Sequence, residues 1–213
     1  MVDIRIYVGG GVLPGDNTAT QTIDNSEKLR ESFYHLFSQY VDDAKFNLIV
    51  EIGAGEKQAA NFFKLQNLKS NNSLLVIDLD QPSNKRDEKI QYLELQNNKD
   101  EVIFMVQKME AWILSQPERI DRILSGRFKR EKRNVKLCDD NNLQNKHPEE
   151  IKNPDRVLNT IFQRYFSETK RGKKKKKKYG KLKDAPVLLI SLDAKKLKKM
   201  FTDVENLYNI LNN

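Results

Sequence analysis

An apolar run that ends in two acidic residues sets the strongest limit on how this chain can fold. Residues 74–80 read Leu-Leu-Val-Ile-Asp-Leu-Asp, and Gln81 and Pro82 follow. Four apolar residues in a row, two of them β-branched, are typical of a strand that is covered on both faces in a parallel sheet. Ligands of such sheets bind just beyond the carboxyl ends of the strands. Asp78 and Asp80 are therefore candidate site residues.

The spacing of Asp78 and Asp80 indicates what they could bind. Residues i and i+2 point to the same side of a strand, so the two carboxylates would converge if the strand continued. Converging carboxylates repel each other, and a hard divalent cation such as Mg²⁺ or Mn²⁺ relieves that repulsion. The pair therefore predicts a metal site. So short a motif leaves open the alternative that both acids are solvated at a strand end that enters a turn.

Strand-like and helix-like segments alternate along the chain. Asp24 and Glu27 have the spacing of a capping box, which predicts a helix from there to Tyr40. We expect strands over about residues 3–8, 46–52, 74–80 and 102–106, and helices over about 24–40, 56–68, 107–114, 117–124 and 155–166, with two short helices at the end. This order predicts an α/β fold, a Rossmannoid parallel sheet flanked by helices.

We divide the chain into two parts by its composition. Residues 1–125 carry the alternating pattern and are predicted to form the α/β core. Residues 126–213 contain a polar excursion, a helix, a lysine-rich segment and the C-terminal helices, which we expect to pack on that core. No run approaches the roughly 18 apolar residues that a transmembrane helix needs, so we expect no membrane partner.

The few sulfur and imidazole side chains restrict the metal chemistry. Cys138 is the single cysteine, which excludes an internal disulfide framework, and His35 and His147 are the two histidines. A structural zinc site is therefore disfavoured, and any metal would be held by oxygen. The N-terminus lacks the pattern of a secretory signal, so we expect a cytoplasmic protein.

The positive charge is concentrated in one segment. The net charge is +8, from 38 basic and 30 acidic residues, but the segment Lys170–Lys183 holds ten basic residues and no acidic one. Such a run repels itself, so we expect a mobile segment that contacts phosphates, with Tyr179 available to stack on a base. A solvated loop or a compositional bias is the alternative. The candidate nucleic-acid contacts are Lys173, Lys174, Lys175, Lys176, Lys177, Lys178, Lys181 and Lys183.

A third carboxylate lies in a helix that is apolar on most sides. Val106, Met109 and Trp112 share one face of this segment, whereas Glu110 lies on another with further apolar residues. A helix that is apolar nearly all round is buried. Glu110 would then need a metal, an arginine or a backbone donor as its partner. The alternative is that the Glu110 edge of the helix meets water.

A glycine turn supports a different function class. Residues 50–55 read Val-Glu-Ile-Gly-Ala-Gly, like the turn that cradles S-adenosylmethionine in methyltransferases, and Asp78 or Asp80 would then bind the ribose. Lys57 stands where a third glycine is expected, and a complete strand–helix unit precedes the turn. A Gly-x-Gly turn into a helix is common, so the methyltransferase is kept only as an alternative.

Several of these motifs occur together, in order, in a known family. They are the opening Ile-Arg-Ile-Tyr-Val before glycines, the turn at residues 53–55, the Asp78-Leu-Asp80 strand end, the segment 106–114 and the basic stretch with Tyr179. In this order the chain resembles the bacterial domain-of-unknown-function (DUF) 4276 family, which is regarded as TOPRIM-like. Members resemble TOPRIM nucleases and often occur beside ABC-type ATPases in phage-defence operons.

The resemblance implies roles for particular residues. In TOPRIM nucleases an acidic pair holds Mg²⁺ and a glutamate after the first strand helps to move protons. The pair is present here as Asp78 and Asp80, but relatives read Val-Glu-Gly-Gly where this chain has Gly9 after Val8. Either a different glutamate substitutes, or the protein is a weakened or inactive relative. The candidate substitutes are Glu110, Glu51 and Glu56.

The resulting hypothesis is an Mg²⁺-dependent nuclease subunit of an antiviral complex with an ATPase. Asp78 and Asp80 would hold the metal, and Glu110 would be the third catalytic carboxylate. The alternative from another class is a non-catalytic TOPRIM-like subunit that binds nucleic acid or serves as a scaffold, which Gly9 favours.

Overall fold

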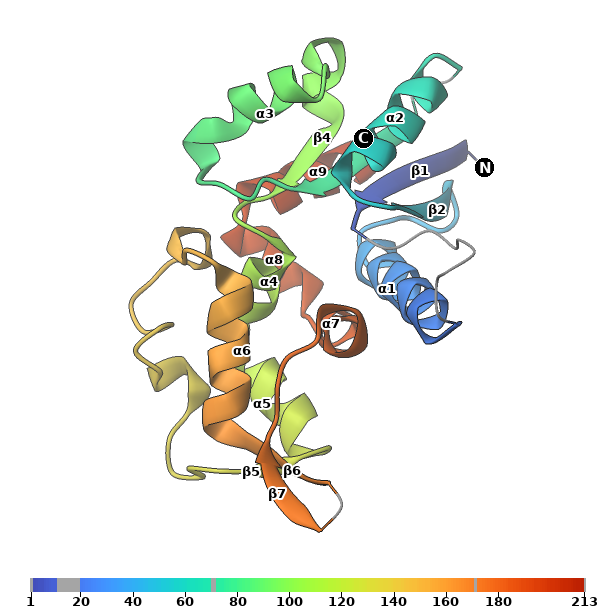
Figure 1. The fold of residues 1–213 in the computed structure, drawn as a ribbon. Coiled ribbons are helices and arrows are strands. Elements are labelled where there is room, and N and C mark those ends of the chain that lie inside the picture. The colour runs from blue at the N-terminus through green and yellow to red at the C-terminus, as the bar shows by residue number, and fades with distance from the viewer. Residues whose placement is uncertain (1, 11–19, 70–71, 171, 213) are drawn as a thin grey trace.

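A four-stranded parallel sheet organises the fold in the computed structural model, which describes residues 2–10, 20–69, 72–170 and 172–212 (Figure 1). The strands stand in the order β2-β1-β3-β4, and all three pairings are parallel. The predicted α/β class with a parallel sheet flanked by helices is confirmed. The strands are β1 (Val2–Gly9), β2 (Phe46–Gly53), β3 (Ser73–Asp78) and β4 (Val102–Met105).

The two faces of the sheet are covered by different helices. Because successive side chains of a strand point to opposite faces, Leu74 and Val76 join one apolar cluster, whereas Leu75 and Ile77 join another. Helix α2 packs on β1 and β3 over the second cluster, while α1 packs on β2 and α9 on β4 over the first. The bounds of these helices are Thr20–Ser38 for α1, Glu56–Asn67 for α2 and Thr202–Asn212 for α9. Helix α3 (Arg86–Tyr92) adds Ile90 to the second cluster.

The remaining helices extend the first cluster away from the sheet. Val76 of the sheet belongs to the same cluster as Trp112, Phe162, Leu189 and Leu207 from four different helices. The C-terminal helices thus complete the core that the sheet begins. These helices are α4 (Met109–Leu114), α5 (Pro117–Ser125), α6 (Pro154–Tyr165), α7 (Lys181–Ile190) and α8 (Ala194–Met200). Short 3₁₀ turns cover Ser83–Lys85, Gln96–Glu101, Leu137–Asp139 and Pro148–Glu150.

A small antiparallel sheet projects from the end that lies opposite the parallel sheet (Figure 1). Its strands are β5 (Lys129–Arg130), β6 (Phe166–Lys170) and β7 (Lys173–Lys176). Four lysines of the lysine-rich segment form β7, and the mobility predicted for this segment stays a prediction. Pairing is favoured because Glu168 of β6 stands opposite Lys175, and because Lys174 forms an ion pair of 2.8 Å with Glu131.

Two local predictions at the start of the chain have different outcomes. Helix α1 begins at Thr20, so Asp24 lies inside the helix and the predicted capping box is wrong. The loop predicted around Pro14 and Gly15 lies outside the described residues. Among the helices that are described, none combines the length and the apolar character that crossing a bilayer demands.

Candidate functional site

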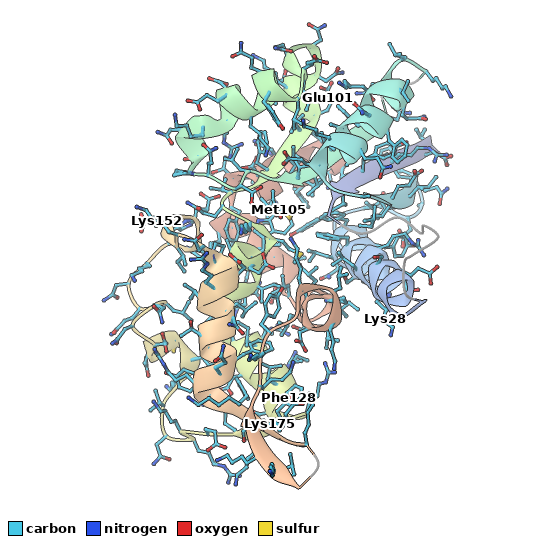
Figure 2. All side chains as sticks on the ribbon, in the orientation of Figure 1. Lys28, Glu101, Met105, Phe128, Lys152 and Lys175 are labelled. Atoms are coloured by element: carbon cyan, nitrogen blue, oxygen red, sulfur yellow. The ribbon has the colours of Figure 1, made fainter. Side chains whose placement is uncertain are left out.

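The three acidic residues singled out from the sequence line one surface hollow. It has a volume of about 400 Å³ and is lined by Asp78, Asp80 and Glu110 together with Lys108 and Lys181. It lies at the carboxyl end of β3, where strand β4 leads into α4. The end of β4 is marked by the label of Met105, the register partner of Asp78, near the middle of Figure 2.

Asp78 is the last residue of β3 and is held from two sides. Its Oδ1 accepts a hydrogen bond of 2.7 Å from the backbone N–H of Met109, in the first turn of α4. Its Oδ2 accepts a hydrogen bond of 3.1 Å from the Nζ of Lys181. Burial raises the pKa of Asp78 to about 6; the ammonium of Lys181 opposes this rise, and the negative charge of Glu110 adds to it. Asp78 can therefore exchange a proton close to neutral pH.

Asp80 does not continue the strand. Strand β3 ends at Asp78, and Asp80 has a left-handed φ of 59°. The strand expected over residues 74–80 therefore ends early, so the condition for the two aspartates to point the same way along one strand is not met, although both line the hollow. The side chain of Asp80 is half exposed, and its carboxylate lies 4.0 Å from the Nζ of Lys89. Asp80 thus stands at the solvent side, and Asp78 on the buried side.

Glu110 is buried, as expected for a helix that is apolar on most sides. Its side chain is 1% exposed, and its Oε1 accepts a hydrogen bond of 2.9 Å from the hydroxyl of Tyr179. Within the described part of the chain, Oε2 of Glu110 has no hydrogen-bond partner. Burial and the charge of Glu110 raise the pKa of Tyr179 well above its usual value, so the phenol stays protonated and keeps donating.

Lys181 pairs with a carboxylate in the structure, and its predicted contact with phosphate stays a prediction. It is the first residue of α7, and its ammonium pairs with Asp78 inside the hollow. Burial alone would lower the pKa of Lys181, but the neighbouring charges of Asp78 and Glu110 outweigh it, so the pKa is raised. Lys181 therefore stays charged and acts as a cation built into the site.

The carboxylates of the hollow suit Mg²⁺ better than a metal ion that needs a full set of protein ligands. The described residues contain no group of three Asp, Glu, His or Cys side chains placed to hold a metal ion. Mg²⁺ does not require one, because it is usually bound by one or two carboxylates and completes its shell with water and substrate phosphates. Asp78 and Asp80 line the same hollow and offer two such carboxylates.

The three candidate substitutes for the glutamate missing at Gly9 lie in different places. Glu110 lines the hollow. Glu56 forms an ion pair with Lys89, the lysine that approaches Asp80, whereas Glu51 is bound to Arg5 at 2.9 Å. Of the three, Glu110 is therefore the glutamate that shares the hollow with Asp78.

Close packing leaves no room for a side chain at Gly9. A Cβ there would lie 2.8 Å from Cγ2 of Ile77 and 3.2 Å from Cα of Glu56. Separations this short force a neighbour to shift, and Glu56 meets the added atom with its backbone. A glutamate at this position would therefore push α2 away from β1.

The other lysines of the basic segment divide into exposed and buried ones. Those that are exposed are Lys173, Lys174, Lys175, Lys176, Lys178 and Lys183. Lys177 is 5% exposed; its Nζ pairs with Asp184 at 2.8 Å and lies 5.5 Å from the ring centre of Phe162. The expectation that Lys177 holds phosphate is therefore wrong. Tyr179 packs edge-on against Phe162, so its ring does not offer the predicted base-stacking surface.

The glycine turn that suggested a methyltransferase has a packing role. A Cβ at Gly53 would lie 2.6 Å from the backbone nitrogen of Ala59, so glycine allows α2 to approach β2 closely. Strand β1 also lies between β2 and β3, which separates this turn from Asp78. Both observations argue against a shared cofactor site.

Comparisons with protein-family models, with curated proteins and with solved structures find no match for this chain.

Proposed function

We propose that the hollow around Asp78 is the site of an Mg²⁺- or Mn²⁺-dependent nuclease that cleaves phosphodiesters of nucleic acid. One observation carries the proposal. Four carboxylates line one hollow at the carboxyl end of a parallel sheet, where α/β proteins bind their ligands. Asp78 and Asp80 stand at the end of β3, Glu110 lies in α4, and Asp155 of α6 pairs with Lys108 at 3.1 Å. The TOPRIM-like assignment and the nuclease class follow from the resemblance noted in the sequence.

Asp78 and Asp80 would hold the metal ion. When bound, such an ion neutralises developing charge on a phosphate and lowers the pKa of a coordinated water. Glu110 is held in place by the hydroxyl of Tyr179 and keeps one carboxylate oxygen without a hydrogen bond from any described residue. That oxygen is the one available to accept a proton or a ligand.

The basic residues of the hollow suit the substrate. Lys108, Arg156 and Lys181 line it beside the carboxylates, and ammonium and guanidinium groups bind non-bridging phosphate oxygens. Lys181 pairs with Asp78 in the absence of a bound metal ion. Its flexible stem allows its Nζ to turn toward a phosphate once Asp78 is otherwise neutralised.

Cleavage of plasmid DNA and of RNA in Mg²⁺ or Mn²⁺ tests the proposal. We expect Asp78→Asn and Glu110→Gln each to lose at least about 100-fold in rate, which corresponds to about 2.7 kcal/mol of barrier. Asp100→Asn, an exposed acid outside the hollow, is the matched control and should retain full activity. Equal activity of all four proteins would show that the cleavage comes from elsewhere.

A non-catalytic subunit is the second candidate, and the packing at Gly9 favours it. The glutamate that the resemblance calls for is absent, and a Cβ at this position would meet the backbone of Glu56. The protein would then use the same fold to bind nucleic acid or to dock on an ABC-type ATPase in a defence complex; that partner rests on the family resemblance alone. Wild-type protein that binds nucleic acid but cleaves none with either metal supports this candidate.

A further inference from the structure

A second basic run, separate from the lysine segment, lies in the polar excursion. Residues 127–136 read Arg-Phe-Lys-Arg-Glu-Lys-Arg-Asn-Val-Lys, with six basic residues and one acidic residue. In the fold, Lys129 and Arg130 of this run form β5, which pairs with β6, and β6 pairs with β7. Two basic runs that are far apart in the sequence therefore meet in one sheet. We call residues 127–136, 166–170 and 172–178 the basic arm.

The cations of the basic arm surround two hollows on its surface. One, of about 660 Å³, is lined by Lys129, Arg133 and Lys136 together with Glu118 and Asp121 of α5. The other, of about 700 Å³, is lined by Lys132, Lys174 and Lys176 together with Glu131. Several exposed cations of the arm form no ion pair with any described residue, namely Lys129, Lys132, Arg133, Lys136, Lys173, Lys175 and Lys176. Their charge is thus available to an anionic partner.

We infer that the basic arm binds the backbone of double-stranded DNA. The inference rests on the proposed function, because it takes nucleic acid as the partner, and it adds the duplex and a second set of contacts. Regularly spaced phosphates are the polyanion that matches two groups of exposed lysines and arginines, one on either side of β6. The contacts are sequence-independent, since they reach the backbone and not the base edges.

The shape of the arm favours a B-form duplex. Strand β5 pairs only at Ser167 and Phe166 of β6, so the part in which Glu168–Lys170 pairs with Lys173–Lys175 is a two-stranded ribbon. The major groove of B-DNA, about 12 Å wide, admits such a ribbon, whereas the deep and narrow major groove of A-form RNA does not. Alternate residues of a strand point to opposite faces, so β7 presents lysines to both walls of a groove.

The aromatic residues of the arm do not offer a platform for single strands. Binding of single strands without sequence preference relies on exposed rings that stack on bases. Phe166, together with Tyr165 just before the arm, is buried beneath the guanidinium of Arg130. Phe128 is partly buried and lies under the ammonium of Lys177. A duplex, whose bases are paired and stacked in its interior, fits this surface better than a single strand does.

Helix α6 connects the basic arm with the hollow at Asp78. Its first turns carry Asp155 and Asn159, which line that hollow, and its last residue, Tyr165, leads directly into β6. Twelve residues of α-helix span about 18 Å at 1.5 Å per residue. That length equals about five base-pair steps of 3.4 Å, so one short duplex can reach both places.

Fluorescence anisotropy in EDTA tests the inference without any cleavage. The probes are a labelled 20-base-pair DNA duplex, an RNA duplex of the same sequence and the single DNA strand, each titrated between 50 and 200 mM KCl. We expect the DNA duplex to bind at least tenfold more tightly than the other two. The triple variants K129Q/R133Q/K136Q and K173Q/K175Q/K176Q should each bind it at least tenfold more weakly, and each should reduce the salt slope by about 0.9 for every phosphate that is no longer neutralised.

The matched control is K28Q/R30Q/K99Q, which removes three exposed basic residues that lie outside the arm; Figure 2 labels Lys28 on α1 and Lys175 on the small antiparallel sheet. It should bind as wild type. Equal or tighter binding of the RNA duplex or the single strand overturns the duplex-DNA assignment, and unchanged binding of K129Q/R133Q/K136Q overturns the two-run arm. The failures of the two proposals are distinguishable: wild type that binds the duplex in EDTA but cleaves none in Mg²⁺ or Mn²⁺ overturns the proposed function alone, whereas wild-type cleavage with unchanged duplex binding by both triple variants overturns the arm alone.

Discussion

Asp78 and Lys181 form an ion pair, with 3.1 Å between Oδ2 and Nζ, across a sequence separation of 103 residues. The pair joins the end of β3 to the first turn of α7, and so connects the parallel sheet to the segment that follows the basic arm. It also places a cation beside the carboxylate to which we assign metal binding. The charge state of the hollow is thus set by residues from both halves of the chain.

Replacement of Lys181 by glutamine should strengthen cation binding in the hollow. The ammonium competes with a metal ion for Asp78, and the loss of one unit charge a few ångströms away is expected to tighten Mn²⁺ binding about tenfold. Electron paramagnetic resonance of free Mn²⁺ measures this affinity. Lys183→Gln, on the same helix but exposed, should leave the affinity unchanged. The same affinity in both variants would contradict the idea that Lys181 competes with the metal.

The stability of the protein should depend on the ionisation of Asp78. Its pKa is raised from 3.8 to about 6 in the folded state, so between these pH values the folded chain binds more protons than the unfolded chain. The free energy of unfolding should therefore fall as pH rises from about 4 to 6, by on the order of 3 kcal/mol from this group. Chemical denaturation of wild type and Asp78→Asn across this range isolates the effect, because the difference between them should change with pH.

The Tyr179–Glu110 hydrogen bond should show a measurable coupling. Tyr179→Phe removes the donor to Oε1 of a carboxylate that is 1% exposed, and a buried charged acceptor left without its partner costs about 1–3 kcal/mol. Glu110→Gln should restore part of that stability when it is added to Tyr179→Phe, since a neutral amide is less costly to bury. Urea denaturation of the four proteins in a double-mutant cycle gives the coupling energy. Additive effects would show that the hydroxyl and the carboxylate do not interact.

Asp203 should be among the acids on which stability depends most. Its carboxylate is buried, accepts a hydrogen bond of 2.7 Å from Nη1 of Arg86 and another of 3.0 Å from the backbone N–H of Phe104. Asp203→Ala leaves both donors unpaired and should lower the free energy of unfolding by about 3 kcal/mol. Glu205→Ala, an exposed acid on the same helix, should change it by less than about 0.5 kcal/mol. Equal effects would show that the Asp203 contacts contribute little.

The sequence predicts the elements whose patterns are local. The apolar run before Asp78 indicates a strand covered on both faces, and β3 lies inside the sheet, between β1 and β4. The segment around Glu110 is apolar on most sides, and α4 is entirely buried. Both signals arise from consecutive residues, so they could be read without knowledge of the rest of the fold.

The contacts that complete the site are not local and carry no signal of that kind. Tyr179 donates a hydrogen bond to Glu110 across a sequence separation of 69 residues. The local pattern around either residue does not predict this contact. Asp80 leaves the strand because aspartate tolerates the left-handed conformation, which the pattern of alternating residues does not reveal. The lysines of β7 have low strand propensity, and they pair because the fold brings Glu131 and Glu168 beside them.

The contact between Asp203 and Phe104 has a consequence for biosynthesis. Strand β4 is the outer strand of the parallel sheet, and the N–H of Phe104 on its open side is bonded by a carboxylate that lies 99 residues later in the chain. The ribosome synthesises Phe104 before Asp203, so the sheet can form while the open edge of β4 is not yet bonded by Asp203. Until residue 203 has emerged, the growing chain presents an unprotected strand to its neighbours, and shielding by a chaperone would matter most in that interval.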